Sequence, residues 1–240
     1  MPVLVRRSAA CFIFAFSPWL STADAYTQQP DAATVIHGVD TSVQSRYEHV
    51  LAFTDLEHYA VYRGSDLTHP AAEMTVKDTY RKGVGKTYDI LSESGSGAVI
   101  RFGLNPLLKN ETDVNQPANL PNSWFTSANY EMQPKLGTMQ HVNGRDCIAI
   151  RIKAKRKATN AIDGSIWVDA KDYSLVQIDG IGTKSPSMFS GAAHMMRQYA
   201  QIDGFPMATH ARAESDSFFF GRTVVIIDYS GYQLQLQPGK

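Results

Sequence analysis

The stretch Gly83-Val84-Gly85-Lys86-Thr87 has the residue types of a loop that cradles phosphates. Such a loop needs another glycine five residues before the one that precedes its lysine, because its backbone N–H groups must wrap around the phosphates. Tyr80 occupies that position, and strand-forming residues follow where the loop should open a helix. We therefore interpret the stretch as a turn between two strands that binds no nucleotide. In such a turn Lys86 should be exposed, and its replacement should change stability only slightly.

Histidines and a single strand cysteine are the other side chains that could do chemistry. The histidines do not have the spacing of a HExxH zinc site, and the chain contains neither a GxSxG nucleophile elbow nor a CxxC pair. Cys147 has only Arg145 nearby as a weak activator, so we interpret it as a structural residue. We predict no metal site, no cofactor and no catalytic residue. The histidines are His37, His49, His58, His69, His141, His194 and His210.

The first 25 residues have the layout of a secretory signal peptide. Arg6 and Arg7 form a basic start, an apolar run covers residues 9–20, and Ala23-Asp24-Ala25 is a small-x-small cleavage signal. The apolar run is about half as long as a membrane-spanning helix requires. We expect cleavage after Ala25 and export to the periplasm, and we expect residues 26–240 to form one domain.

Charge and cysteine usage narrow the classes of partner and fold. Two of the 23 basic residues and one of the 23 acidic residues lie in the first 25 positions, so the mature chain carries 21 basic and 22 acidic residues, a net charge of −1. This balance gives no sign of nucleic-acid binding. Cleavage also removes Cys11 and leaves Cys147 as the one cysteine, so the fold must depend on its hydrophobic core. We expect a monomer.

Alternation of apolar and polar residues predicts an antiparallel sheet. It is clearest at residues 72–81, where Met74, Val76 and Tyr80 share one face and polar side chains share the other. An Asn143-Gly144 pair marks a tight hairpin turn. Further strands are predicted at residues 59–63, 86–92, 130–136, 138–142 and 146–155, on both sides of Ala170-Lys171-Asp172, and at 192–201, 207–215 and 223–229.

Helical patterns are confined to two regions. Apolar residues from Val43 to Leu51 have helical spacing, and Thr41 and Ser42 can cap that helix. Asn105-Pro106 interrupts the second region and predicts two short helices that meet there. Because a large sheet cannot leave its apolar face in water, the helices must cover it. We predict an α+β fold: a strongly curved antiparallel sheet, a half-open β-barrel, with about three helices against its concave face.

Three segments carry a resemblance to a known family. Together with the signal peptide and the order of elements, they resemble the LolA-like periplasmic proteins, the group of the outer-membrane lipoprotein carriers. The resemblance implies a half-open barrel with helices in its mouth that binds acyl chains, with a lipid or an acylated lipoprotein as partner and a membrane-bound donor or acceptor. The segments are GSGAVIRFGLNPLLKNE, GSIWVDAKDYSLVQIDG and TVVIIDYSGYQLQ, the second being the most family-like.

Apolar residues on one face of the predicted sheet are the candidates for contact with an acyl chain. In a closed domain, helices would fill the space over this face completely. In a LolA-like fold, part of that space stays open for a ligand, and the sequence pattern fits both arrangements. The candidates are Met74, Val76, Ile148, Ile150, Ile152, Ile166, Val168, Val176 and Ile178.

Two surface features could contact a membrane or a partner. Cations alternate with isoleucines along one strand, and they form either an ordinary solvated face or a basic strip for anionic headgroups. Two apolar loops either fold back to cap the open end of the sheet or dip into a membrane interface. The candidates are Arg151, Lys153 and Lys155 on the strand and Met188, Phe189, Phe218, Phe219 and Phe220 in the loops.

Together these features favour a non-enzymatic function, the binding and transport of a lipid or an acylated lipoprotein. The ligand would exchange its acyl chain between water and an apolar cavity, with a gain of about 0.8 kcal/mol for each buried CH₂. One alternative is an RseB-like sensor of envelope stress that binds acylated ligands, for which the chain is short because such sensors carry a second domain. Another is an enzyme with a hydrophobic substrate in the barrel mouth, which no paired nucleophile and base supports.

Overall fold

The structure is a computed structural model that describes residues 30–158, 160–184, 193–217 and 221–238. Its helical segments are α1 (Ala32–His49), α2 (Gly97–Val99), the π-helical turn η1 (Ile100–Leu104), α3 (Asn105–Val114) and the 3₁₀ turn η2 (Leu120–Ser123). Its strands are β1 (Val50–Arg63), β2 (Ala72–Arg81), β3 (Gly85–Gly95), β4 (Tyr130–Val142), β5 (Arg145–Ala154), β6 (Ile162–Asp169), β7 (Leu175–Gly182), β8 (His194–Ile202), β9 (Phe205–Ser217) and β10 (Gly221–Leu236).

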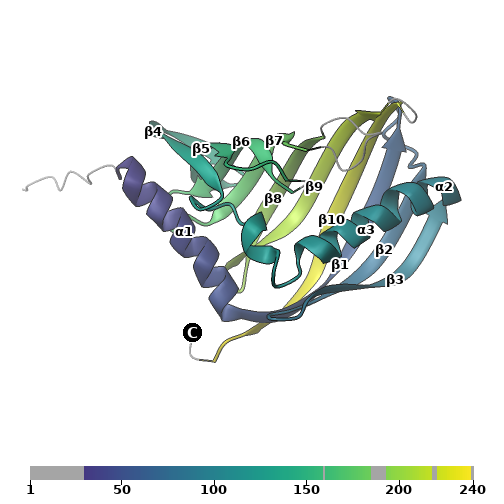
Figure 1. Ribbon diagram of the computed structural model, residues 1–240, viewed down its shortest axis with the longest axis horizontal. Helices are drawn as coiled ribbons and strands as arrows, with labels where there is room; N and C mark the ends of the chain where they lie inside the picture. Colours follow the sequence, from purple (N-terminus) through teal and green to yellow (C-terminus); the bar gives the residue numbers. More distant parts are fainter. Residues whose placement is uncertain (1–29, 159, 185–192, 218–220, 239–240) are drawn as a thin grey trace, which may run out of the picture.

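All ten strands form one antiparallel sheet in the order β3-β2-β1-β10-β9-β8-β7-β6-β5-β4. The last strand, β10, pairs with the first, β1, inside the sheet, while β3 and β4 form its edges. The sheet is strongly curved, and α1 and α3 lie within the curve (Figure 1). The predicted fold class, a curved antiparallel sheet with helices against its concave face, is confirmed.

Helix α1 begins earlier and ends earlier than the sequence pattern predicts. Its N-cap is Asp31, whose carboxylate accepts a 2.8 Å hydrogen bond from the backbone N–H of Thr34, a stronger start signal than the expected caps at Thr41 and Ser42. Val50 and Leu51, expected at the end of the helix, already belong to β1, because β1 pairs with β10 from Val50 onward. Pairing on both sides makes β1 a 14-residue strand.

The second helical region lies where it was predicted, but it is not divided into two helices. The chain turns helical at α2 and passes through η1 directly into α3, and Asn105 has helical dihedral angles and does not act as a cap. Pro106, which has no N–H to donate, follows directly on the π-helical turn, where the usual i→i−4 hydrogen bonds are already replaced. The continuous α2–η1–α3 segment crosses the strands β1 to β3 (Figure 1).

Each helical segment covers a different part of the concave face. Val35 and Val39 of α1 pack on isoleucines of β5 to β7. Leu104 and Leu108 of η1 and α3 pack on β1, β2 and β10 around Tyr59. The core is therefore divided into two main clusters, one beneath each helical segment. Within the described residues, no helix is long and apolar enough to span a membrane.

A glycine lets α1 approach the tip of the β6–β7 hairpin. A β-carbon added at Gly38 would lie 2.2 Å from Cδ2 of Tyr173, so the helix can dock at this distance only without a side chain there. Tyr173 itself has a φ of 57°, a left-handed conformation that is uncommon for a tyrosine. Glycine inside a helix costs roughly 0.5–1 kcal/mol relative to alanine. The close approach explains why glycine nevertheless stands at this position.

Gly38→Ala should therefore destabilise the protein by about 1–3 kcal/mol, despite the better helix propensity of alanine, because its methyl group overlaps the Tyr173 ring. The measurement is the free energy of unfolding in urea. The matched control makes the same change in a Tyr173→Ala background, where alanine should stabilise the helix by up to about 1 kcal/mol. Stabilisation by Gly38→Ala in the otherwise unchanged protein would contradict the packing described.

Candidate functional site

A cavity of about 650 Å³ lies between the concave face of the sheet and the helices. Side chains of α1, of the α2–η1–α3 segment and of strands β1 and β8 to β10 line it. On β9 both Met207 and Ser215 reach the cavity, and these positions, eight residues apart in the sequence, are separated by up to about 26 Å along the strand. The space is thus elongated, and its volume lies within the range of about 300–1,000 Å³ that is usual for small-molecule sites.

Two rows of cross-strand partners form the floor of the cavity. Alanines occupy the β9 position in both rows, where larger side chains would fill the space above the sheet. The cavity is therefore open over these rows because the side chains of Ala211 and Ala213 on β9 are small. The rows are Met195–Ala213–Val225–Val61 and Arg197–Ala211–Ile227.

Of the nine apolar residues predicted to contact a lipid, one, Ile178, lines the cavity. The other eight are buried in the core, where those of β5 and β6 pack with α1, and Met74 and Val76 pack with η1 and α3. Alternation of apolar and polar residues identifies the concave face of the sheet, but it does not show which parts of that face the helices cover. The residues chosen from this alternation therefore lie mostly in the covered parts. Contact of these residues with a lipid stays a prediction. The eight are Met74, Val76, Ile148, Ile150, Ile152, Ile166, Val168 and Val176.

Sequence reasoning missed the residues of the cavity floor, although their strands were predicted. A partial signal was present, because every second residue from Met195 to Tyr199 and from Ala211 to Ser215 lines the cavity, although Met196 and Arg212 between them do so too. Every second residue from Thr223 to Tyr229 lines it as well. What marks these strands is their mixed composition, with alanine, arginine and tyrosine in place of the continuous isoleucine and valine of the covered strands.

The basic strip has the predicted alternation. Arg151 and Lys153 are exposed on β5, whereas Ile150 and Ile152 are buried on its other face. Lys155 donates a 2.6 Å hydrogen bond to the backbone carbonyl of Ser127. Contact of the strip with a membrane or a partner stays a prediction. The predicted loop contacts, Met188, Phe189, Phe218, Phe219 and Phe220, lie outside the described residues.

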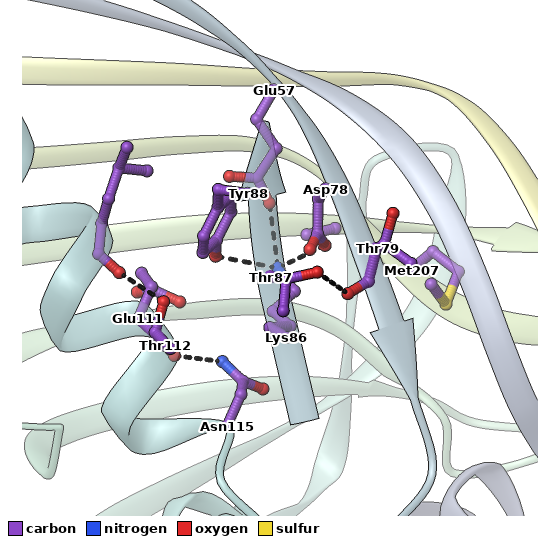
Figure 2. A network of polar contacts seen from close by, with 12 residues as sticks. Glu57, Asp78, Thr79, Lys86, Thr87, Tyr88, Glu111, Thr112, Asn115 and Met207 are labelled. Atoms are coloured by element: carbon purple, nitrogen blue, oxygen red, sulfur yellow. Dashed lines mark hydrogen bonds and ion pairs between the residues drawn. The ribbon is translucent and has the colours of Figure 1, made fainter. Parts of the chain in front are cut away.

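Lys86 is not an exposed turn residue, and that prediction was wrong. The turn itself is present, but β3 starts at Gly85, and Lys86 pairs with Tyr80 of β2. Its side chain is 12 % exposed, and its Nζ lies 2.9 Å from Glu57 Oε1 and 2.8 Å from Asp78 Oδ2 (Figure 2). It also donates a hydrogen bond of 3.3 Å to the Tyr88 hydroxyl. Its replacement therefore cannot be neutral.

The carboxyl groups around Lys86 outnumber it. Asp55, Glu57 and Asp78 are all buried on β1 and β2, and the Tyr59 hydroxyl donates a hydrogen bond to Glu57. Burial raises the pKa of Asp55 to about 8, although the nearby Lys86 ammonium acts in the opposite direction. Burial likewise raises the pKa of Asp78. The cluster therefore keeps a proton at neutral pH, which reduces the buried negative charge.

Lys86 supplies the positive charge of this cluster. Burial by itself lowers the pKa of Lys86, but the neighbouring Glu57 and Asp78 outweigh burial and hold it well above its ordinary value. Oxygens of Asp55, Glu57 and Asp78 lie within 4.8 Å of one another, as they would around a metal ion. The ammonium group already contacts two of these carboxylates, those of Glu57 and Asp78, so the arrangement is a buried ion cluster with Asp55 as a third, protonated acid.

The other candidates for chemistry lie apart from the cavity. Cys147 is fully buried in β5, and burial raises the pKa of its thiol, in keeping with a structural role. Five histidines each lie within 3.5 Å of one carboxylate on the surface, a common arrangement of exposed side chains. They are His58, His69, His141, His194 and His210.

Comparison with solved structures finds proteins of similar fold. A LolA superfamily protein from Nitrosomonas europaea is 10 % identical with a TM-score of 0.45, over 87 % of this chain and 96 % of its own. A DUF1329 family protein from Desulfovibrio piger is 12 % identical with a TM-score of 0.41, over 84 % and 93 %. A domain named for outer-membrane lipoprotein sorting, from Vibrio parahaemolyticus, is 12 % identical with a TM-score of 0.44, over 82 % and 91 %.

These similarities agree with the resemblance to LolA-like proteins seen in the sequence, and they concern the fold alone. No family model matches the chain, and no curated protein matches it.

Lys86→Met should destabilise the protein by about 3–5 kcal/mol, because it leaves buried carboxylates without their cation. The loss should be smaller at pH 5 than at pH 8, since protonation of the carboxyls then removes the uncompensated charge. The free energy of unfolding in urea is the measurement. Lys77→Met is the matched control, since Lys77 is exposed on β2, and its change should stay within about 0.5 kcal/mol. Equal effects of the two substitutions would contradict the ion cluster.

The raised pKa of Asp55 should also make the stability depend on pH. Between the ordinary carboxyl pKa of 3.8 and about 8, the folded chain holds a proton that the unfolded chain releases. Stability should therefore fall as the pH rises through this range and level off above it. Asp55→Asn removes the titration and should flatten that slope by an amount on the order of 1 kcal/mol per pH unit.

Urea unfolding from pH 5 to pH 9 measures this slope. Asp89→Asn, at an exposed position of β3, is the control and should leave the slope unchanged. An unaltered slope in Asp55→Asn would show that Asp55 is ionised in the folded protein.

Proposed function

We propose that this protein binds the acyl chain of a lipid or of an acylated lipoprotein in the cavity and carries it through the periplasm without chemical change. The observation that supports this proposal is the cavity itself, which is elongated, lies on the concave face and has an apolar floor around Ala211, Ala213 and Val225. A chain enclosed there would gain about 0.8 kcal/mol for each buried CH₂. A few buried methylenes are therefore enough for useful affinity.

The α2–η1–α3 segment forms one rim of this cavity. Phe102 of η1 lines the cavity and is 65 % exposed, so its ring stands where the cavity meets solvent. Leu104 and Leu107, from the same segment, face the cavity from the covered side. An acyl chain that entered past Phe102 would first touch exposed apolar surface at the rim and then the buried apolar side chains inside the cavity. It would contact apolar side chains along the whole path.

Polar groups beside the cavity are mostly engaged with one another. Lys86 is held by Glu57 and Asp78, and Arg197 lies 3.8 Å from Glu111. Such paired groups suit a binding site better than a catalytic one, because a general base or nucleophile must be available to a substrate. This supports binding without catalysis. The N-terminal segment with its Ala23-Asp24-Ala25 signal supports export.

Neutral straight-chain alcohols test the acyl-chain site without a charged headgroup. Their affinity, measured by displacement of a fluorescent apolar dye, should rise about fourfold for each added methylene and then level off when the chain fills the cavity. Ala213→Phe should lower the affinity for long alcohols at least tenfold without loss of stability, because it fills open space. Ala149→Phe, on the outer face of β5, should leave the affinity unchanged. Affinity that does not depend on chain length, or on Ala213→Phe, would refute the proposal.

A further inference from the structure

One cation at the cavity lacks an acidic partner. Arg46 of α1 lines the cavity, and its Nε is buried without a hydrogen-bond partner among the described residues. Its Nη2 donates only to the sulfur of Met207, at 3.5 Å, and a thioether is a weak acceptor. No described carboxylate forms an ion pair with Arg46, whereas Lys86 and Arg212 each have one. Leaving a buried guanidinium N–H unsatisfied costs free energy that a bound acceptor would recover.

The two atoms concerned form one edge of the guanidinium group. An arginine presents Nε–H and an Nη–H side by side, and this fork matches the two oxygens of a carboxylate or a phosphate. At Arg46 that edge has only the weak sulfur contact. The unoccupied donors therefore match an anionic group of a ligand in both charge and shape.

Most of the cations at the cavity wall are neutralised by carboxylates. Among the described residues that line it, five are basic and one, Glu111, is acidic. Lys86, Arg197 and Arg212 each form an ion pair with a carboxylate, whereas Arg46 offers its positive charge to a ligand. The basic residues are Arg46, Arg63, Lys86, Arg197 and Arg212.

Arg46 lies at a distance along β9 from the small side chains of the cavity floor. Arg46 contacts β9 at Met207, whereas the alanines of the floor follow four and six residues later along the same strand, at Ala211 and Ala213. Strand geometry places these alanines about 13 and 20 Å from Met207 along the strand. A ligand with its charged group at Arg46 would thus lay its chain along the apolar floor.

We propose that the cavity selects amphiphiles with one anionic headgroup, which Arg46 binds through its Nε and Nη2 edge. This inference rests on the proposed acyl-chain function and specifies the class of ligand. The headgroup is a carboxylate or a phosphate monoester, as in a free fatty acid or a lysophospholipid of the phosphatidic acid type. Both offer paired oxygens to the same fork.

The test compares three ligands with the same C18 chain: oleic acid, oleyl alcohol and oleoyl lysophosphatidic acid. Their dissociation constants are measured with the full mature chain at pH 8, below the concentrations at which they aggregate. One or both acids should bind at least tenfold more tightly than the alcohol, and the tighter of the two identifies the headgroup. Arg46→Gln should remove this preference and leave the affinity for the alcohol unchanged.

Two further variants separate the fork from charge and from folding. Arg46→Lys keeps the charge but not the fork, so it should retain only part of the preference. Arg81→Gln, at an exposed position of β2 away from the cavity, should retain all of it. Equal binding of acids and alcohol by the unaltered protein would overturn the inference and leave the acyl-chain function standing. Failure of all three ligands to bind would refute that function as well.

Discussion

The structure depends on one constraint: a ten-stranded sheet exposes a long concave apolar face, and the described helices cover only parts of it. Helix α1 covers the β5 to β7 side through Val35 and Val39, and the α2–η1–α3 segment covers the β1 and β2 side through Leu104 and Leu108. Apolar surface that is not covered costs about 25 cal/mol for each Å² left in water. The protein limits that cost with small side chains between the two covered regions, where Ala211 and Ala213 stand on β9. The cavity is thus a direct consequence of how two helical segments are placed on one sheet.

The same arrangement explains why charged residues can border an apolar cavity. Strands β1 to β3 carry a buried group of three carboxyls and one lysine. An ion pair at such a site contributes little net stability, because desolvation offsets most of the Coulomb attraction, but removal of one partner is expensive. The group therefore holds β1, β2 and β3 in a fixed register, whatever it adds to the total stability. The raised pKa of Asp55 follows from the excess of acid over base in a buried place.

Arg46 differs from these residues in that no carboxylate in the described part of the chain forms an ion pair with it. It comes from α1, and its Nη2 donates to the sulfur of Met207 on β9. A protein that balances Lys86, Arg197 and Arg212 with carboxylates has left one guanidinium edge to be satisfied from outside. Arg46 thus offers a cation without a carboxylate partner among the described residues, and small side chains stand further along β9, an arrangement that suits the headgroup and the chain of an amphiphile. Shape alone would accept any chain, whereas the unpaired cation makes the site discriminate by headgroup.

The sequence by itself determined the fold class and most strands. Alternation of apolar and polar residues with period two is a local signal, which does not depend on which strand pairs with which. The β2 strand at residues 72–81 and the turn at Asn143-Gly144 are examples that hold to the residue. Only the tertiary structure decided which parts of the concave face are filled. Ile150 and Val76 look no different in the sequence from residues that would line a cavity, and Lys86 looks like an exposed turn residue until β1 and β2 place Glu57 and Asp78 beside it. The physical reason is that periodicity reports which side of a strand is apolar, whereas an open cavity, a buried ion pair and an unpaired arginine depend on which distant segments lie across that side.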